Sequence, residues 1–269
     1  MTGEQLRVIH PTDFSPVSNR AFAHALRLAI ATHGELLLLH LETHKVDKPS
    51  WRDFPHVRDT LEAWGMLQPG AARSDVQTKV GIHVAKFDIV DPDIAHGVAG
   101  FTEKYGGDLL VMGTEGPRRF AGSKAEDIFR TAHMPTLFVP AGARGFVDAT
   151  NGQPLLRRVV APVDHAPKPL NAIRQLARLI VPLGLPAHGL ELIHIGRDAP
   201  EIRLAGQDRP LPVTCLDGPV VDTILARAQD ADLIALTTEG RHGVLDALRG
   251  TTTERVLHGA PCPVLAIPA

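Results

Sequence analysis

Short apolar runs alternate with longer amphipathic stretches along the whole chain. The runs are nearly continuous in apolar residues, as in parallel strands that are covered by helices on both faces. The ten predicted strands are Val8–Pro11, Glu35–Leu41, Lys79–Phe87, Asp108–Gly113, Thr136–Val139, Val159–Pro162, Glu191–Ile195, Val213–Leu216, Leu233–Thr237 and Val264–Ile267. Strand–helix alternation with right-handed crossovers predicts the α/β class, with doubly wound, open, parallel sheets.

Helical spacing of apolar residues marks the stretches between the strands. The first helix is expected to begin near Ser18 or Asn19, which are suitable N-caps, and to stop at Gly34. A further helix is expected after Pro92, because proline suits the first helical turn. The last helix of this half is expected at residues 123–132.

The chain contains this pattern twice. Residues 7–13, Arg-Val-Ile-His-Pro-Thr-Asp, return as residues 158–164, Arg-Val-Val-Ala-Pro-Val-Asp. Residues 110–116, Leu-Val-Met-Gly-Thr-Glu-Gly, return as residues 234–240, Ile-Ala-Leu-Thr-Thr-Glu-Gly. Two further blocks recur in the same order, which predicts a tandem duplication rather than chance similarity.

The duplication predicts two five-stranded domains, at residues 1–144 and 155–269. Residues 145–154 are rich in turn formers and are expected to be an exposed linker. The second copy is shorter in its middle: residues 196–210 are rich in Arg, Asp, Pro and Gly, and are not expected to contain a helix. The total length of 269 residues agrees with two domains of about 150 residues or fewer.

Composition narrows the classes of function. The net charge of −2 without a basic stripe argues against a nucleic-acid partner. No apolar stretch approaches the roughly 20 residues that cross a bilayer, so no membrane partner is expected. The N-terminus shows no secretion signal, and we expect a cytoplasmic protein. Cys215 and Cys262 lie far apart without a metal-binding spacing, and both are expected to be buried, reduced thiols.

Catalytic and metal motifs are not evident in the sequence. There is no HExxH motif, no Cys/His cluster and no nucleophile beside a base, so no metal site is predicted and catalysis is uncertain, at most slow ATP hydrolysis. His40 and His194 occupy equivalent positions and either contact a ligand or are structural. Glu115 and Glu239 either position a water or Mg²⁺ or are ordinary surface residues.

The best candidates lie where the strands end, because ligands of doubly wound sheets bind beyond the carboxyl ends of the strands. Asp13 and Asp164 end the first strand of each copy. Each carboxylate could accept a hydrogen bond from a ribose hydroxyl or an adenine amino group. Each could equally form an N-cap or Asx-turn that starts the next helix, and the residues alone leave both interpretations open.

The loop after the fourth strand of the second copy is the other candidate. Gly240 and Gly250 can bring backbone amides close to phosphate oxygens, and Thr251 and Thr252 add hydroxyls at the start of the last helix, whose positive end favours anions. The alternative is a turn with a capping box between Thr251 and Glu254.

The equivalent loop of the first copy is four residues shorter. Its candidates are Gly113, Gly116, Gly122 and Ser123. Pro117 removes one backbone donor from this loop. A shorter loop encloses less volume and offers fewer amides, so these are the weaker candidates.

Together these features resemble the universal stress protein family. The resemblance rests on Pro11-Thr-Asp-Phe-Ser15 after the first strand, on the glycine pattern, and on Ala260-Pro-Cys-Pro-Val-Leu265 near the end, and it covers nearly the whole chain twice. The family pattern Gly-x2-Gly-x9-Gly-Ser/Thr wraps the phosphates of ATP. The resemblance therefore implies an adenine nucleotide alpha hydrolase-like fold that binds ATP or AMP, with Mg²⁺ possible alongside ATP.

Carried over by position, the pattern favours nucleotide binding in the second copy. It departs from the family at Thr237, where threonine replaces the first glycine. The implied contacts are Pro162, Asp164, Ile195, Thr237, Gly240, Gly250, Thr251 and Thr252, with Asp13, Gly113, Gly116, Gly122 and Ser123 as the weaker first-copy set. The first copy keeps the glycines but fails the middle spacing.

The resemblance also implies that two such domains pair through their last strands. Residues 136–139 are therefore expected to meet residues 264–267 within one chain, as an intramolecular pseudo-dimer that could form a homodimer. Three functions remain open: a stress-related nucleotide-binding sensor, a nucleotide-free interaction protein with degenerate pockets, and an ATP-dependent enzyme. The absence of a Ser-Gly-Gly-x-Asp-Ser loop after the first strand disfavours the enzyme.

Overall fold

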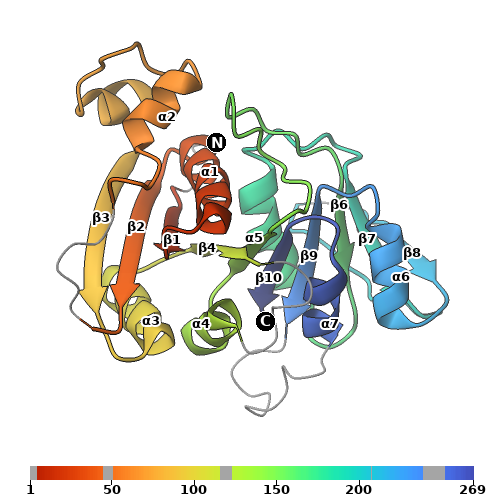
Figure 1. Cartoon of the computed structure of the whole chain (residues 1–269). Coiled ribbons are helices and arrows are strands. Elements are labelled where there is room, and N and C mark those ends of the chain that lie inside the picture. The colour runs from red at the N-terminus through yellow and green to blue at the C-terminus, as the bar shows by residue number, and fades with distance from the viewer. Residues whose placement is uncertain (1–4, 45–50, 116–122, 207, 239–251) are drawn as a thin grey trace.

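A computed structural model describes residues 5–44, 51–115, 123–206, 208–238 and 252–269. Its centre is one ten-stranded sheet with the order β3-β2-β1-β4-β5-β10-β9-β6-β7-β8 (Figure 1). The strands of the first half are β1 (Arg7–Thr12), β2 (Glu35–Glu42), β3 (His83–Val90), β4 (Leu109–Thr114) and β5 (Thr136–Pro140). Those of the second half are β6 (Val159–Pro162), β7 (Leu190–Ile195), β8 (Val213–Leu216), β9 (Leu233–Thr238) and β10 (Val264–Pro268).

Helices cover both faces of this sheet, as expected for a doubly wound α/β fold (Figure 1). In the first half they are α1 (Pro16–Ala31), α2 (Val57–Ala63), α3 (Ile94–Tyr105) and α4 (Lys124–Ala132), with a π-helical turn, η1 (Val76–Val80). In the second half they are α5 (Leu170–Ile180), α6 (Val220–Arg227) and α7 (Thr252–Gly259). The sequence prediction of two tandem, five-stranded units is confirmed.

The two halves join through their last strands, as the family resemblance implied. β10 pairs with β5 antiparallel, with Val264 opposite Phe138 and Ala266 opposite Thr136. All other ladders of the sheet are parallel. Each half thereby covers the apolar edge strand of the other, which removes an exposed edge that would otherwise template association.

Two apolar layers run without interruption across the junction of the halves. One layer lies under α1 and α5 and includes Leu137 of β5 and Leu265 of β10. The other lies under α3, α4, α6 and α7 and includes Phe138 and Val264. Because β-strand side chains alternate between faces, consecutive residues of β5 enter opposite layers, which explains the nearly continuous apolar runs in the sequence.

Several predicted boundaries shift. The first helix begins at Pro16 with Ser15 as its N-cap, not at Ser18 or Asn19, because the Ser15 side chain accepts a hydrogen bond from the Ser18 amide at 3.2 Å. This helix also ends before Gly34, with Thr32 as its C-cap. No described residue between 196 and 210 is helical, as expected.

The third strand begins four residues later than predicted. Residues 76–80 form the π-helical turn η1, which Gly81 ends in a left-handed conformation at φ 79°. Strand β3 then starts at His83 and pairs with β2 over its whole length. The predicted segment Lys79–Phe87 therefore combined the end of this turn with the first half of the strand.

The segment between the halves is more buried than a linker was expected to be. Phe146 is 1% exposed, and its backbone amide donates to His24 Nε2 at 3.2 Å. Trp64 donates from Nε1 to the carbonyl oxygen of Ala149 at 2.9 Å, and its ring fills the space beside Gly152, where a Cβ would approach within 2.3 Å. These contacts tie the segment to α1 and to the end of α2.

Candidate functional site at the carboxyl edge of the sheet

Each half has a switch in strand order where a crevice is expected. The chain runs outward from β1 to β3 and returns to β4 on the other side of β1, and the second half repeats this with β6 and β9. β1 and β4 pair only through Val8 and Ile9, and β6 and β9 only through Val159 and Val160. The ends of these strands are thus unpaired with each other, which makes the switch points the natural ligand sites.

In the first half, the aspartate at this edge supports the start of a helix. Asp13 Oδ1 accepts a hydrogen bond from the Ser15 amide at 3.0 Å, and Ser15 in turn caps α1. The helix-starting role that the sequence left open is therefore the one that Asp13 performs here. Its side chain remains exposed, so the other carboxylate oxygen can still contact solvent.

Aromatic side chains fill the same edge of the first half. Phe14, held at φ 62°, stacks on His40 with ring centroids 4.1 Å apart. Trp51 meets Phe14 edge-on at 5.0 Å, and Phe54, which is 1% exposed, lies 5.8 Å from Phe14. We call Phe14, His40, Trp51 and Phe54 the aromatic plug. It covers the ends of β1 and β2 with the protein's own rings.

Polar contacts anchor the plug on its outer side. Trp51 Nε1 donates to Asp88 Oδ1 on β3 at 2.7 Å. The Lys86 ammonium lies 4.7 Å from the centre of the Trp51 ring, a cation–π contact. Burial lowers the pKa of Lys86 below its usual value of 10.5. The plug is therefore anchored to β3 on its outer side.

The first-copy glycine loop is only partly described. Gly113 supports packing: a Cβ there would lie 2.7 Å from the Val17 carbonyl oxygen, so the first turn of α1 sits directly on β4. Ser123 is the N-cap of α4 and accepts from the Glu126 amide at 3.2 Å. Gly116 and Gly122 lie outside the described residues.

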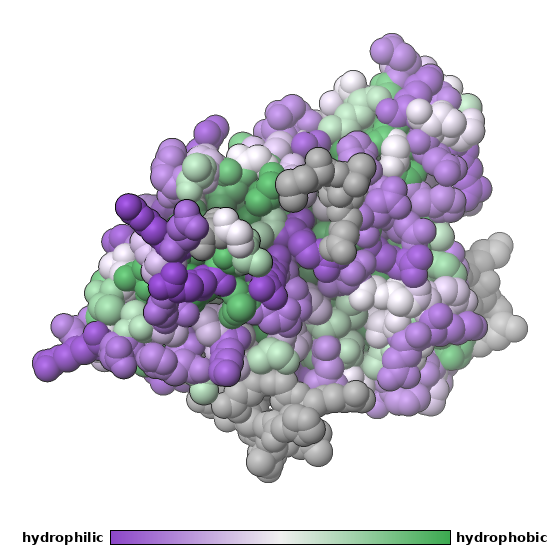
Figure 2. Space-filling view, turned by 180° about the vertical axis from the view of Figure 1, so that it is seen from behind, coloured by the Kyte–Doolittle hydropathy of each residue, from purple (hydrophilic) through white to green (hydrophobic). Residues whose placement is uncertain are grey.

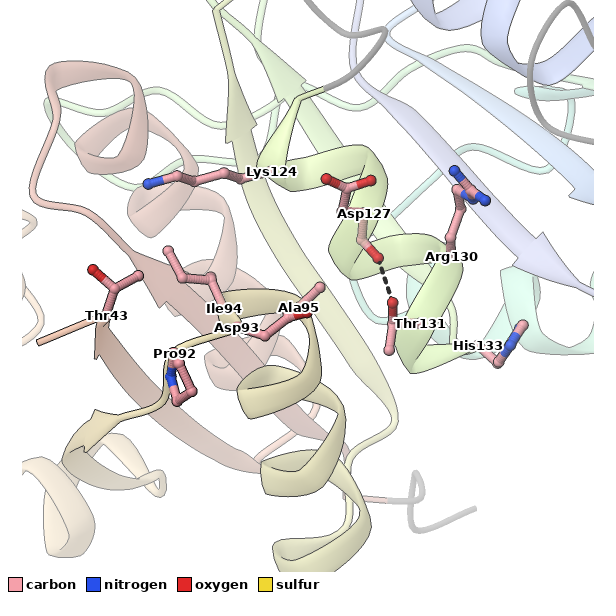
Figure 3. A pocket seen from close by; sticks show the side chains of 10 residues that line it. All are labelled: Thr43, Pro92, Asp93, Ile94, Ala95, Lys124, Asp127, Arg130, Thr131 and His133. Atoms are coloured by element: carbon pink, nitrogen blue, oxygen red, sulfur yellow. Dashed lines mark hydrogen bonds between the residues drawn. The ribbon is translucent and has the colours of Figure 1, made fainter. Parts of the chain in front are cut away.

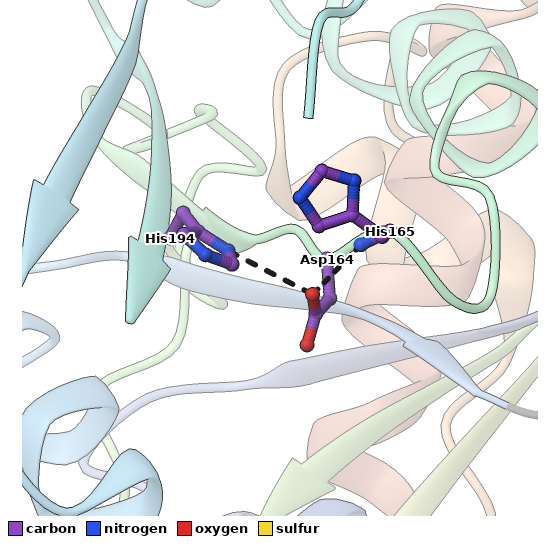
Figure 4. Close-up of side chains that lie close together, drawn as sticks. All are labelled: Asp164, His165 and His194. Carbon is purple, nitrogen blue, oxygen red and sulfur yellow. Dashed lines mark hydrogen bonds and ion pairs between the residues drawn. The ribbon is translucent and has the colours of Figure 1, made fainter. Parts of the chain in front are cut away.

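The second half places a different set of side chains at its edge. Asp164 and His165 are exposed and follow β6 directly, and His194 is buried near the end of β7 at 7% exposure. His194 Nδ1 donates to the Val163 carbonyl at 3.0 Å and lies 3.9 Å from Asp164 Oδ1. Figure 4 shows these three side chains gathered together. We call them the Asp–His cluster.

The remaining predicted residues of the second half lie around this cluster as far as they are described. Pro162 ends β6, Ile195 ends β7, and Thr237 lies near the end of β9, all half-buried. Thr252 is exposed at the first position of α7. The phosphate-loop candidates Gly240, Gly250 and Thr251 lie outside the described residues, as does Glu239.

Two differences in chain length leave fewer of the described side chains at the second edge than at the first. In the first half, α1 starts four positions after β1 ends, whereas α5 starts eight positions after β6 ends. The segment that carries Trp51, Phe54 and α2 has no helical counterpart between β7 and β8 in the described residues. Phe14 is replaced by His165, whose ring lies 5.8 Å from His194 in an edge-on arrangement instead of stacking.

A shallow hollow of about 690 Å³ lies beside the first-half edge, between α3 and α4 (Figure 3). Its lining is mixed in charge: Lys124, Asp127 and Arg130 lie on α4, and Asp93 is the N-cap of α3. Thr131 donates to the Asp127 carbonyl at 2.8 Å across this helix face. None of the predicted nucleotide contacts within the described residues lines the hollow, so the two switch points remain the candidate ligand sites.

Figure 2 shows the opposite side as largely hydrophilic, with apolar residues in small, scattered areas. Among the described residues, no helix is long and apolar enough to cross a membrane.

The sequence prediction missed His165. Metal and catalytic motifs have fixed spacings within one stretch of chain, whereas this cluster joins residues from two strand ends. A signal was present: Asp164 and His165 follow one strand, and His194 is the last residue but one of the strand that pairs with it. Adjacent parallel strands bring such residues to one edge.

Comparisons with known proteins agree with this architecture. The model of the universal stress protein family matches residues 6–140 and 186–268. The universal stress protein MJ0531 of Methanocaldococcus jannaschii is 30% identical over 146 residues, which cover 51% of this chain and 84% of that protein. The second family match begins at residue 186, so it leaves out β6, Asp164 and His165.

Solved structures show the same fold over nearly the full length. A universal stress protein from Archaeoglobus fulgidus superposes with a TM-score of 0.62 at 17% identity, covering 98% of this chain and 97% of that one. The protein PA1789 of Pseudomonas aeruginosa, described as functionally unknown, gives a TM-score of 0.65 at 16% identity, covering 99% of this chain and 94% of that one. Both span the two halves.

Proposed function

We propose that this chain, which belongs to the universal stress protein family, is a regulatory adenine-nucleotide-binding protein whose ligand binds at the carboxyl edge of its second half. The proposal assigns ATP or AMP to the crevice between β6 and β9. It gives the first half a structural role, as the rigid partner that completes the shared sheet.

The contrast between the two edges carries this proposal. The aromatic plug fills the first edge, whereas the second edge presents the exposed carboxylate of Asp164. Asp164 Oδ1 accepts from the His165 amide at 2.7 Å, and among the described residues Oδ2 accepts no hydrogen bond. A ribose diol can donate to this oxygen. Charge-assisted hydrogen bonds of this kind contribute about 1.5–3 kcal/mol.

The other described candidates have chemistry that suits the rest of a nucleotide. Pro162 and Ile195 offer apolar, half-buried surface for the base. Thr237 and Thr252 carry hydroxyls, and Thr252 stands in the first turn of α7, where the helix dipole favours phosphate oxygens. Mg²⁺ would accompany ATP through its phosphates. Gly240, Gly250 and Thr251 complete the proposed phosphate loop in sequence.

Calorimetric titration of the whole protein with ATP and Mg²⁺ tests this assignment, with two matched variants. Asp164→Asn keeps the side-chain size and removes the charge, and we expect at least tenfold weaker binding. Asp13→Asn makes the same change in the first half and should bind as the parent does. The reverse result would place the nucleotide in the first half and overturn the assignment.

A second variant separates the phosphate loop from the ribose contact. Gly250→Val adds bulk where a phosphate approaches the backbone and should abolish ATP binding while leaving adenosine binding weaker but measurable. If neither ATP nor AMP binds to the folded parent protein, the nucleotide-free interaction protein becomes the better description.

A further inference from the structure

Three side chains of the second half converge in a way that neither nucleotide binding nor helix capping requires. Asp164, His165 and His194 each offer one ligand atom, and these atoms lie within 4.8 Å of one another (Figure 4). Two imidazoles and one carboxylate form a donor set that divalent transition ions, and Zn²⁺ in particular, commonly take in proteins. The cluster draws on two separate elements, the loop after β6 and strand β7.

Backbone carbonyls already orient both imidazoles. His165 Nε2 donates to the Asp198 carbonyl at 2.7 Å, which leaves the lone pair of a neutral ring on Nδ1. His194 is buried and fixed by its bond to the Val163 carbonyl. For His165 such a bond is the usual outer support of a metal ligand, because it fixes the ring and its tautomer while the other nitrogen is available to the ion. His194 differs, because its Nδ1 is both the nitrogen bonded to Val163 and the one near Asp164.

The distances fit a site that closes slightly when an ion enters. Donors about 2.0–2.2 Å from one tetrahedral ion stand about 3.4 Å apart. His194 Nδ1 and Asp164 Oδ1 are 3.9 Å apart, and the three ligand atoms lie within 4.8 Å of one another. The exposed side chains of Asp164 and His165 therefore have to approach the ion by roughly 0.5–1.4 Å. The His194 proton then moves from Nδ1 to Nε2, and Nδ1 exchanges its bond to Val163 for the ion.

Space is available for this exchange because of a glycine. Gly196 adopts φ 152°, and a Cβ at this position would lie 2.7 Å from His194 Nε2. Any larger residue would press on the ring. The glycine thus lets the imidazole keep its place at the end of β7, with its second nitrogen able to carry the displaced proton.

The first half provides an internal contrast. Asp13 and His40 occupy the equivalent positions, and His40 likewise donates to the carbonyl of the first strand, from Nδ1 to Thr12 at 2.8 Å. The third donor is missing there, because Phe14 stands in place of His165 and stacks on the imidazole. One residue therefore separates a three-donor cluster from a two-donor cluster.

We propose that Asp164, His165 and His194 form a binding site for a divalent transition ion of the Zn²⁺ class, completed by water. Its ligand Asp164 is also the residue assigned to the nucleotide ribose, so the ion and the nucleotide compete for one carboxylate. The metal site does not depend on the nucleotide assignment, since all three ligands belong to the described chain.

The test is a titration of the nucleotide-free, full-length protein with Zn²⁺, followed by calorimetry. His165→Phe reproduces the first-half residue and is expected to weaken the tightest Zn²⁺ binding at least tenfold. Asp164→Asn is expected to weaken it too. His188→Phe changes an exposed histidine outside the cluster and should leave this binding unchanged. Circular dichroism establishes that each variant is folded.

Co²⁺ provides a second readout that simple surface binding would not give. Absorption bands of a four-coordinate Co²⁺ ion should appear with the parent and with His188→Phe, and be lost in His165→Phe. Equal Zn²⁺ affinity in all four proteins, or no saturable Zn²⁺ binding by the parent, would overturn the metal site. Neither result would affect the ATP titration, so the two proposals can fail separately.

Discussion

The two halves of the sheet have the same strand order, but different side chains lie at their carboxyl edges. The first edge is filled by Phe14, His40 and Trp51, and the helix that follows β1 packs directly on Gly113 of β4. At the second edge the helix starts later, Thr237 replaces the glycine, and Asp164 and His165 are exposed. Strand order alone therefore does not determine whether a switch point can receive a ligand.

The difference is easiest to understand from the shared sheet. Because β5 pairs with β10 and both apolar layers cross this junction, each half stabilises the other. A tandem chain can therefore close one pocket with aromatic side chains, gaining apolar burial, and keep the other open. A polar edge buries less apolar surface and therefore contributes less to stability. The apolar surface that the aromatic plug buries in the first half offsets this difference.

Lowering the pH should cause the largest loss of folding stability, through buried histidines of the first half. Burial lowers the pKa of His10 and of His24, both in the first half, from 6.5 to about 4. The folded state thus favours neutral rings, and this stability is present above pH 6.5 and lost as the pH falls toward 4. Between about pH 7 and pH 5 the expected loss is about 2 kcal/mol for each ring.

Urea unfolding at the two pH values measures this loss. His24→Gln removes the ring that accepts the Phe146 amide, and should remove roughly half of the pH-dependent loss although it lowers stability at neutral pH. His188→Gln, at an exposed position, is the control and should keep the full dependence. A dependence that is the same in all three proteins would contradict the assignment to buried histidines.

Exchanging the equivalent residues Gly113 of β4 and Thr237 of β9 should have the next largest effect on the free energy of unfolding. Gly113→Thr places a Cβ 2.7 Å from the Val17 carbonyl and 2.8 Å from its Cγ1, which forces α1 away from β4. We expect about 3 kcal/mol of destabilisation, the upper range for overpacking. Thr237→Gly should cost only about 1 kcal/mol, because it removes one half-buried side chain and adds backbone entropy.

Chemical denaturation of the two variants and the parent gives these values directly. Equal losses for both exchanges would mean that the helix after each first strand packs equally closely in both halves. That result would contradict the difference in packing on which the contrast between the edges rests.

The sequence predicted the fold well because the fold depends on features that a sequence shows directly. Ten apolar runs at the right intervals gave the strands, and β6 and β8 were predicted to the residue. The apolar character of 136–139 and 264–267 together with the family resemblance gave their pairing. The N-cap was predicted at Ser18 or Asn19, which was wrong. Pro16 suits the first position of a helix, and it is the signal that would have placed the cap at Ser15.

The candidate site was harder to predict, because it depends on which side chains fill the space. Trp51 and Phe54 are 37 or more positions from Phe14, and nothing in their spacing shows that they fold back over it. Asp13 could be placed at the edge from sequence, but its bond to the Ser15 amide required coordinates. Gly113 was a ligand candidate, and the structure gives it a packing role.

Nucleotide binding should have its smallest effect on tryptophan fluorescence. An unchanged emission is the result that supports binding in the second half. The chain has two tryptophans, Trp51 and Trp64, and both lie in the first half. Trp51 is half-buried in the aromatic plug, so a nucleotide entering the first edge would displace or stack on it and change its emission. A nucleotide in the second half should leave the emission almost unchanged, even at concentrations that saturate the calorimetric signal.

The measurement needs excitation at the red edge of tryptophan absorption, where adenine does not absorb. Trp51→Phe keeps an aromatic ring in the plug and removes the reporter, so it shows how much of any change comes from this position. Strong quenching by ATP in the parent that disappears in Trp51→Phe would place the nucleotide on the first edge. The plug would then be a movable cover that a ligand displaces, and both edges of the sheet would be open to nucleotide.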